Sequence, residues 1–274
     1  REEIARKLNI QLFQFNFCPF CVKVRKYLNL NKIKFNKVEV NIKSKIELNF
    51  TKYRKVPVAL INNTQVLDSS LIISVIESHL ISGQPIGEIL TNYSITHNHD
   101  GENLLVDSPY KVCDPLPVSD ALRVYRDRES FWRELINKEC YKLLHWNVFY
   151  TLCQSIQANQ LIMSSVNVAP IYRILYHLFG GLAMYTISQI RSRPYTDVRE
   201  SLHDFCRQWM KDVGSREFHG GSHYNLADIE MYGAIMSLTP YPVYKNVLSN
   251  VPGIESWIDR MHRHEITTFP RNDR

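Results

Sequence analysis

The sequence lacks a long hydrophobic run. No stretch of about 18 or more uncharged apolar residues occurs, so the chain as given is not predicted to span a membrane. It also lacks the dense, regular cysteines of a disulfide-stapled secreted domain, because its six cysteines include only one closely spaced pair. We therefore expect a reducing compartment.

The chain also has no large excess of charge of one sign. The formal net charge is only +6, and cations and anions are mixed along the chain, so no nucleic acid is expected as a partner. The single C-x-x-C has no second C-x-x-C or H-x-x-x-H to complete a ligand set, so no metal site is expected. No internal repeat or low-complexity tract is present.

The length of 274 residues suits two domains of about 100–200 residues each. The first half carries patterns of short buried strands and amphipathic helices in the order β-α-β-α-β-β-α, which is the thioredoxin topology. The elements are expected at Ile10–Phe15, Cys18–Leu30, Lys34–Val40, Lys43–Phe50, Val58–Ile61, Gln65–Leu67 and Ser69–Ile81. We expect this thioredoxin-like (glutaredoxin-type) α/β domain to occupy residues 8–82.

Residues 83–117 are rich in Gly, Pro, Asn and Asp and have little periodicity, which predicts a linker with a small hairpin near Asp100. Residues 118–270 are expected to form an all-helical second domain. Its helices are predicted near 120–145, 151–165, 170–191, 196–212, 226–238 and 252–262. Asn225 and Asp228 have the spacing of a capping box at the start of one of them.

The run Cys18-Pro19-Phe20-Cys21 is the strongest candidate for a reactive site. Cys18 would lie in the first turn of a helix, where backbone N–H groups and the positive helix end stabilise a thiolate and lower its pKa. Cys21 would lie one turn further in, shielded from solvent. Lys23 is expected on the face of this helix opposite the apolar residues. The competing interpretation is two incidental cysteines.

Two further motifs could surround that thiol. Val56-Pro57 precedes a strand, and a cis bond there would turn the backbone of Val56 toward the thiol, where it could pair with a bound peptide. Asp68 and Ser69 open a helix and could hold the ammonium and carboxylate of a γ-glutamyl group. The alternatives are a trans proline that starts an edge strand and an Asp68 that only caps its helix.

Together these blocks resemble the membrane-associated prostaglandin E synthase type 2 family, of the glutathione-transferase-like superfamily. The resemblance rests on Leu12–Phe15 with the following CPFC run, Tyr53–Pro57, Asp68–Ile73, Gly181–Tyr185, Val198–Glu200 and Asn225–Asp228. It covers nearly the whole chain. Many members carry tyrosine three residues before the first cysteine, where this chain has Phe15, so that hydroxyl is absent here.

The resemblance implies a glutaredoxin-like domain joined to an all-helical glutathione-transferase-like domain, and a homodimer. It implies isomerisation of prostaglandin H2, a lipid substrate, to prostaglandin E2. It also implies binding of glutathione and of haem through the glutathione sulfur. Carried over, Cys18 is the catalytic thiol and Cys21 a secondary thiol. Glutathione would be bound by Val56, Asp68 and Ser69, with Phe20 and Pro57 lining the pocket.

Members of that family associate with membranes, so the resemblance implies a Golgi-membrane or cytoplasmic protein whose membrane contact depends on a segment absent from this chain. Two other functions remain open on the residues alone. One is a glutathione-dependent thiol–disulfide oxidoreductase that uses both cysteines. The other is a haem- and glutathione-binding protein whose main role is not catalysis.

Overall fold

The computed structural model describes residues 1–98, 100, 104–114, 118–164 and 170–266. A short helix, α1 (Glu2–Arg6), precedes the sheet. The sheet is built from β1 (Ile10–Gln14), β2 (Asn36–Glu39), β3 (Val58–Ile61) and β4 (Thr64–Leu67), in the order β2-β1-β3-β4. β1 runs parallel to β2 and antiparallel to β3, and β3 pairs with β4 as a hairpin.

Two helices accompany this sheet, α2 (Pro19–Leu30) and α3 (Ser69–Ser82). Strand order and helix placement confirm the predicted thioredoxin-like domain, with one exception. The helix expected over Lys43–Phe50 is only a 3-10 turn, η1 (Ile46–Leu48). Leu48 is buried there but Ile46 is 64% exposed, so a full helix would have no continuous apolar face to bury.

The segment expected to be a linker contains regular structure. It holds helix α4 (Ile86–Leu90) and the antiparallel strands β5 (Ile95–His97) and β6 (Leu104–Val106), which form the expected hairpin. Helix α4 was not predicted. Ile86 and Ile89 are buried in the main hydrophobic core, so part of this segment packs against the first domain.

The second half is helical, as predicted. Its elements are α5 (Asp120–Leu135), the π-helical turn η2 (Ile136–Cys140), α6 (Tyr141–Val148), α7 (Leu152–Met163), α8 (Pro170–Arg191), α9 (Val198–Val213), α10 (Leu226–Met236), α11 (Pro242–Asn250) and α12 (Ile254–Ile266). The capping box at Asn225 and Asp228 is present, whereas α11 was not predicted. Residues 267–270 of the predicted domain lie outside the described residues. None of the helices in the described ranges is both long and apolar enough to cross a membrane.

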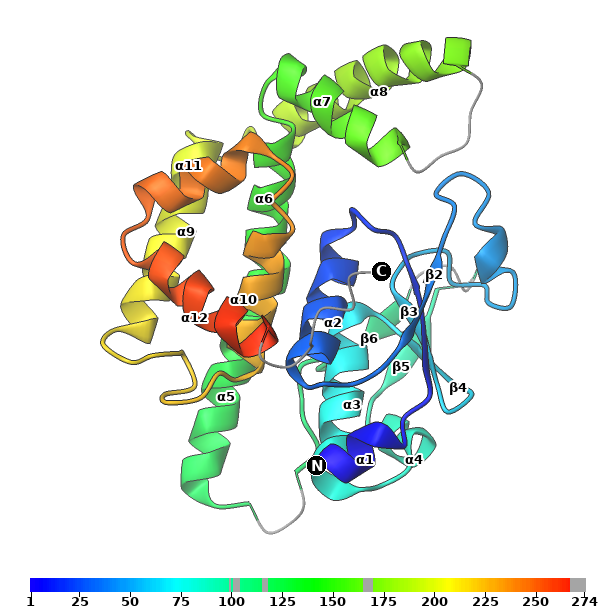
Figure 1. The fold of residues 1–274 in the computed structure, drawn as a ribbon, viewed down its shortest axis with the longest axis vertical. Helices are drawn as coiled ribbons and strands as arrows, with labels where there is room; N and C mark the ends of the chain where they lie inside the picture. Colours follow the sequence, from blue (N-terminus) through cyan, green and yellow to red (C-terminus); the bar gives the residue numbers. More distant parts are fainter. Residues whose placement is uncertain (99, 101–103, 115–117, 165–169, 267–274) are drawn as a thin grey trace.

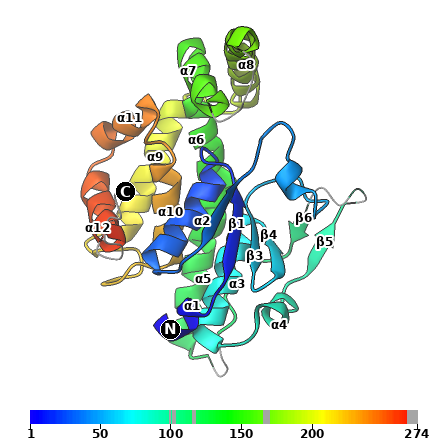
Figure 2. The same ribbon diagram turned by 45° about the vertical axis from the view of Figure 1, so that its right-hand side comes forward.

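Helix α2 joins the two halves of the molecule. It lies between the sheet and α10 in both ribbon views (Figures 1 and 2). A Cβ atom at Gly233 of α10 would lie 2.7 Å from the Cα of Lys23, so only glycine permits this approach of the two backbones. The α7–α8 pair extends away from the rest of the molecule, beyond the N-terminal end of α2 (Figure 1).

Candidate functional site: the thiol at the start of helix α2

Cys18 is the N-cap residue of α2, directly before Pro19 at the first helical position. Its backbone is extended, with φ −73° and ψ 120°, which is the usual geometry at such a position. The side chain is partly exposed, and its Sγ lies 3.9 Å from the carbonyl oxygen of Val56. The thiol therefore lies at the positive end of a helix and remains open to solvent.

The two thiols of the CPFC run differ in ionisation. A hydrogen bond from the Cys21 thiol lowers the pKa of Cys18 against the effect of burial. The backbone N–H groups of Cys21 and Phe20 and the charge of Arg25 add to this lowering. Cys21 is fully buried, and burial raises its pKa well above the usual value. Its Sγ accepts a hydrogen bond from the backbone N–H of Phe15, at 3.5 Å. Cys18 is thus the more readily ionised thiol of the pair.

The other predicted site residues lie beside this thiol or at the start of α3. The Val56–Pro57 bond is cis, as expected. Asp68 caps α3, and its Oδ1 accepts hydrogen bonds from the N–H groups of Ser70 and Leu71 at 2.8 and 3.2 Å. Asp68 therefore caps α3, as the alternative interpretation expects. Only Oδ1 takes part in the cap, and Oδ2 has no hydrogen-bond partner among the described residues.

Phe20 connects the two domains at the same end of α2. Its ring stacks on the ring of Tyr141 of α6, with centroids 4.5 Å apart and planes inclined by 29°. The hydroxyl of Tyr141 is buried and has no hydrogen-bond partner among the described residues. Burial, together with the negative charges of Glu230 and nearby thiolates, raises the pKa of Tyr141, so this phenol stays protonated.

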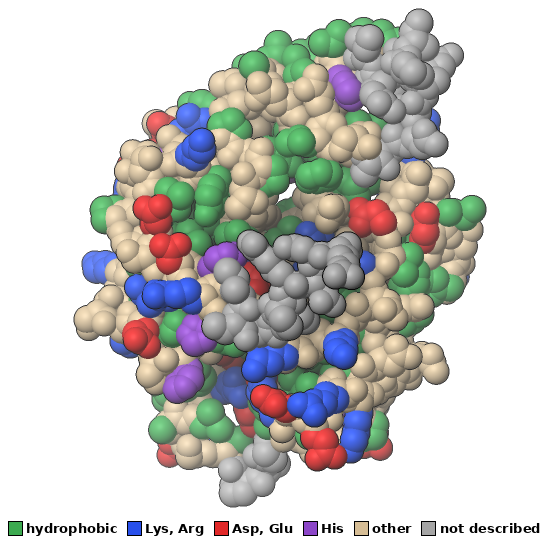
Figure 3. All heavy atoms as spheres, in the orientation of Figure 1, with side chains coloured by type: hydrophobic (Ala, Val, Ile, Leu, Met, Phe, Trp, Pro, Cys, Tyr) green, Lys and Arg blue, Asp and Glu red, His purple; other side chains and the backbone are tan. Residues whose placement is uncertain are grey.

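A cleft of about 170 Å³ opens beside Cys18. Phe17 and Pro19, the two neighbours of Cys18 in sequence, form one wall. The helical domain supplies the rest: Leu144, His145, Val148, Phe149, Ile162, Met184, Ser237, Leu238 and Tyr241. The space-filling view shows a hollow rimmed by hydrophobic side chains between the α7–α8 pair and the body (Figure 3). The cleft is not predictable from the sequence, because its walls come from segments more than 100 residues apart.

A buried ionic cluster fixes α2 and α3 against the helical domain. Lys23, Arg133 and Glu230 have fully buried side chains. Glu230 pairs with Arg133 Nε at 2.7 Å and with Lys23 Nζ at 3.3 Å. Lys23 also donates to Ser70 Oγ at 2.8 Å, one residue from Ser69. The expected position of Lys23 on the polar side of its helix is therefore wrong, because α10 covers that side.

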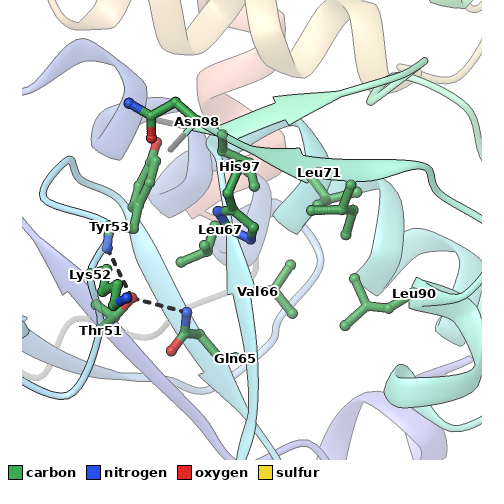
Figure 4. Close-up of a pocket in the computed structure, with 12 residues that line it drawn as sticks. Thr51, Lys52, Tyr53, Gln65, Val66, Leu67, Leu71, Leu90, His97 and Asn98 are labelled. Carbon is green, nitrogen blue, oxygen red and sulfur yellow. Dashed lines mark hydrogen bonds between the residues drawn. The ribbon is translucent and has the colours of Figure 1, made fainter. Parts of the chain in front are cut away.

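A second cavity, of about 470 Å³, lies between β4 and the β5–β6 hairpin. Thr51 Oγ1 accepts hydrogen bonds there from the backbone N–H of Tyr53 and from Gln65 Nε2, both at 3.2 Å (Figure 4). Its walls include none of the predicted site residues, although Leu67 directly precedes Asp68. The sequence neighbours of Cys18, Phe17 and Pro19, line the cleft with apolar walls instead.

Comparisons with known proteins agree with this architecture. Residues 12–80 match the family model described as glutathione S-transferase, N-terminal domain. The chain is 30% identical over 274 residues to prostaglandin E synthase 2 of Mus musculus, covering 95% of this chain and 71% of that protein. It is 27% identical over 273 residues to prostaglandin E synthase 2 of Danio rerio, covering 95% and 72%.

Solved structures show the same fold at low sequence identity. A rice glutathione transferase in complex with glutathione superposes with a TM-score of 0.54 at 14% identity, over 95% of this chain and 91% of that one. The β-etherase LigF from Sphingobium gives a TM-score of 0.54 at 13% identity, over 95% and 98%. The glutathione-transferase-like fold therefore extends over both halves of the chain.

Proposed function

The chain belongs to the prostaglandin E synthase 2 family, and we propose that it isomerises prostaglandin H2 to prostaglandin E2 at the thiol of Cys18. The observation that supports this most directly is the position of that thiol. A cysteine with a lowered pKa lies at a helix N-terminus, and the residues on both sides of it line a cleft with apolar walls. This pairs a nucleophile with a surface suited to a lipid.

The reaction can proceed without a redox cofactor. The Cys18 thiolate attacks one endoperoxide oxygen, so that an S–O bond forms, the O–O bond breaks and the other oxygen becomes an alkoxide. A base then removes the proton on the carbon that carries the sulfur-bound oxygen. The electron pair of that C–H bond forms the ketone, the S–O bond breaks and the thiolate is regenerated. Protonation of the alkoxide completes the isomerisation, with no net change in oxidation state.

Glutathione would lie along the sheet side of the thiol. We propose that the backbone of Val56 pairs with its cysteinyl part, and that Asp68 and Ser69 hold the two charges of its γ-glutamyl end. The free Oδ2 of Asp68 and the buried Ser69 at the start of α3 support this assignment. Pro57 and Phe20 would line the same pocket.

Haem binding through the glutathione sulfur, which the resemblance implies, stays a prediction. The cleft of about 170 Å³ is smaller than the roughly 300–1,000 Å³ of sites for drug-sized ligands, so it would enclose neither haem nor the whole lipid. The steps proposed here are those of the thiol and route nothing through haem.

Thiol–disulfide exchange with glutathione is the second candidate, favoured by the lowered pKa of Cys18. The raised pKa and full burial of Cys21 argue against its use as a resolving thiol, because thiolates are the reactive species. Such exchange would then need only Cys18. Reduction of a glutathione mixed disulfide by a Cys21→Ser variant would identify it.

We also propose a homodimer. The exposed face of α8 carries apolar side chains at helical spacing, including Leu178, Phe179 and Leu182, which are 47–67% exposed. A second copy of the chain could cover this face. In sedimentation experiments the native chain should be a dimer and Phe179→Asp a monomer. A native chain that sediments as a monomer would contradict the proposal.

The decisive test compares two serine variants. Purified native chain, Cys18→Ser and Cys21→Ser are each mixed with prostaglandin H2 and glutathione, and prostaglandin E2 is measured above the background of buffer alone. We expect Cys18→Ser to fall to that background. Cys21→Ser should keep most of the activity, since its hydroxyl can still donate to Cys18. Equal activity of Cys18→Ser and the native chain would refute the proposal.

A further inference from the structure

We propose that the imidazole of His145 is the proton-transfer group of the isomerisation. This rests on the proposed function, because that reaction requires a base close to the sulfur-bound intermediate. His145 lines the same cleft as Phe17 and Pro19, which flank Cys18 in sequence. Of the side chains in that lining, it is the only one that can accept a proton near neutral pH.

The surroundings of His145 leave its nitrogens available. The ring rests against Phe149 one helical turn away, with centroids 4.9 Å apart and planes inclined by 59°. Within the described ranges neither ring nitrogen of His145 has a hydrogen-bond partner, so no acceptor or donor of the protein competes for it. The residue also remains accessible to solvent at the cleft, which allows its proton to exchange with water.

The electrostatics keep this imidazole neutral. Partial desolvation by the surrounding protein and the positive charge of Arg191 at the end of α8 lower the pKa of His145. A neutral imidazole is the form that can take a proton from carbon. The other titratable wall group, Tyr241, has a pKa raised by burial, so its hydroxyl can donate a hydrogen bond but cannot serve as a base near neutrality.

The proton can be followed through one cycle. After the S–O bond has formed, His145 accepts the proton from the carbon that carries the sulfur-bound oxygen, and the S–O bond breaks as the ketone forms. The imidazolium then gives this proton to the alkoxide left by O–O cleavage. Ketone and hydroxyl are produced together, and both His145 and the Cys18 thiolate return to their starting states.

If the proton is not removed from the S–O intermediate, a different product forms. A second thiol, here glutathione, can attack the sulfur of the S–O intermediate instead. That reaction breaks the S–O bond, forms a disulfide with Cys18 and leaves a second alkoxide, so the lipid leaves as a diol. The endoperoxide is then reduced by two thiols rather than isomerised. The ratio of ketone to diol therefore measures proton transfer separately from binding or nucleophilic attack.

The test uses His145→Gln, which keeps the size and polarity of the side chain but removes its basicity. With prostaglandin H2 and glutathione we expect the ketone to fall about 100-fold, within the usual range for loss of a general base. We expect the diol to rise. The matched control is His223→Gln, an exposed histidine outside the cleft, which should keep the native ratio. Added imidazole should restore ketone formation in His145→Ala.

Two results would overturn this role for His145. One is a native ketone-to-diol ratio in His145→Gln. The other is a loss of both products together with slower alkylation of Cys18 by iodoacetamide, which would mean that the substitution disturbs the thiol instead. A native chain that forms no ketone above background would contradict the proposed function itself. The two failures are therefore distinguishable.

Discussion

Helix α2 meets the helical half of the molecule in two different ways along its length. In its second turn, Lys23 lies against Gly233 and in the ionic cluster with Glu230, and water is excluded. At its N-cap, Cys18 remains partly exposed beside a cleft. The sealed contact fixes the position of the helix, and the open end can then present a thiol without closing around it. The turn around Lys23 thus provides the fixed packing, and the N-cap just before it provides the reactive thiol.

Glu230→Ala should have the largest effect on the sealed contact. Although burial opposes it, the charges of Lys23 and Arg133 lower the pKa of Glu230, so the carboxylate is ionised in the folded protein. Its removal leaves two buried cations uncompensated, which typically costs about 3–5 kcal/mol. We expect this loss in the free energy of unfolding measured with urea. Glu255→Ala, an exposed position on α12, is the control. A loss below 1 kcal/mol, small against that range, would show that water reaches the cluster.

The same carboxylate predicts a pH dependence. A carboxyl whose pKa is lower in the folded than in the unfolded state stabilises the protein above its unfolded pKa. That contribution is lost as the pH falls through the folded pKa. The native chain should therefore lose stability in acid, and Glu230→Ala should lose less over the same range. Parallel pH profiles of the two unfolding free energies would contradict this assignment.

Gly233→Ala tests the close approach of α10 to α2. The added methyl would lie 2.7 Å from the Cα of Lys23, and backbone cannot move aside cheaply. We expect a destabilisation of about 1–3 kcal/mol, as for other overpacked cores. Gly87→Ala in α4 has nothing within 4 Å of the added carbon and should be neutral or stabilising. Equal unfolding midpoints for both variants would argue against a tight contact.

Alkylation kinetics sharpen the description of the open end. Because a hydrogen bond from Cys21 is the largest cause of the lowered pKa of Cys18, Cys21→Ala should raise that pKa. Hydrogen bonds to charged groups are worth about 1.5–3 kcal/mol, so alkylation by iodoacetamide at pH 7 should slow about tenfold or more. Cys21→Ser keeps a donor and should resemble the native chain. An identical rate for the alanine and serine variants would contradict the hydrogen bond.

Tyr141→Phe should have the smallest effect. The hydroxyl of Tyr141 is buried without a partner among the described residues, whereas its ring stacks on Phe20. Removal of an unsatisfied buried hydroxyl should leave the free energy of unfolding unchanged or raise it by up to about 1 kcal/mol. Tyr141→Leu, which removes the stacked ring, should destabilise. A destabilised phenylalanine variant would reveal a partner for the hydroxyl.

Local sequence patterns by themselves determined much of the first domain. The strand and helix order, the start of α2 at Cys18-Pro19 and the capping box at Asn225 follow from residue spacing and backbone preferences, which act within a few residues. The helix expected at Lys43–Phe50 does not form, because a local pattern does not show which residues the fold buries. Its apolar residues resemble an amphipathic pattern, but the fold buries only Leu48.

Only the tertiary structure decided which side chains meet across the domains. Lys23 looks like a solvent-facing lysine in its own helix, and its burial depends on Arg133 and Glu230, more than 100 residues away. Likewise, His145 becomes a candidate base only because α6 borders the cleft beside Cys18. Helix formation, helix capping and tight turns depend on residues a few positions apart in the sequence. Burial and charge pairing across distant segments depend on packing, which no local pattern specifies.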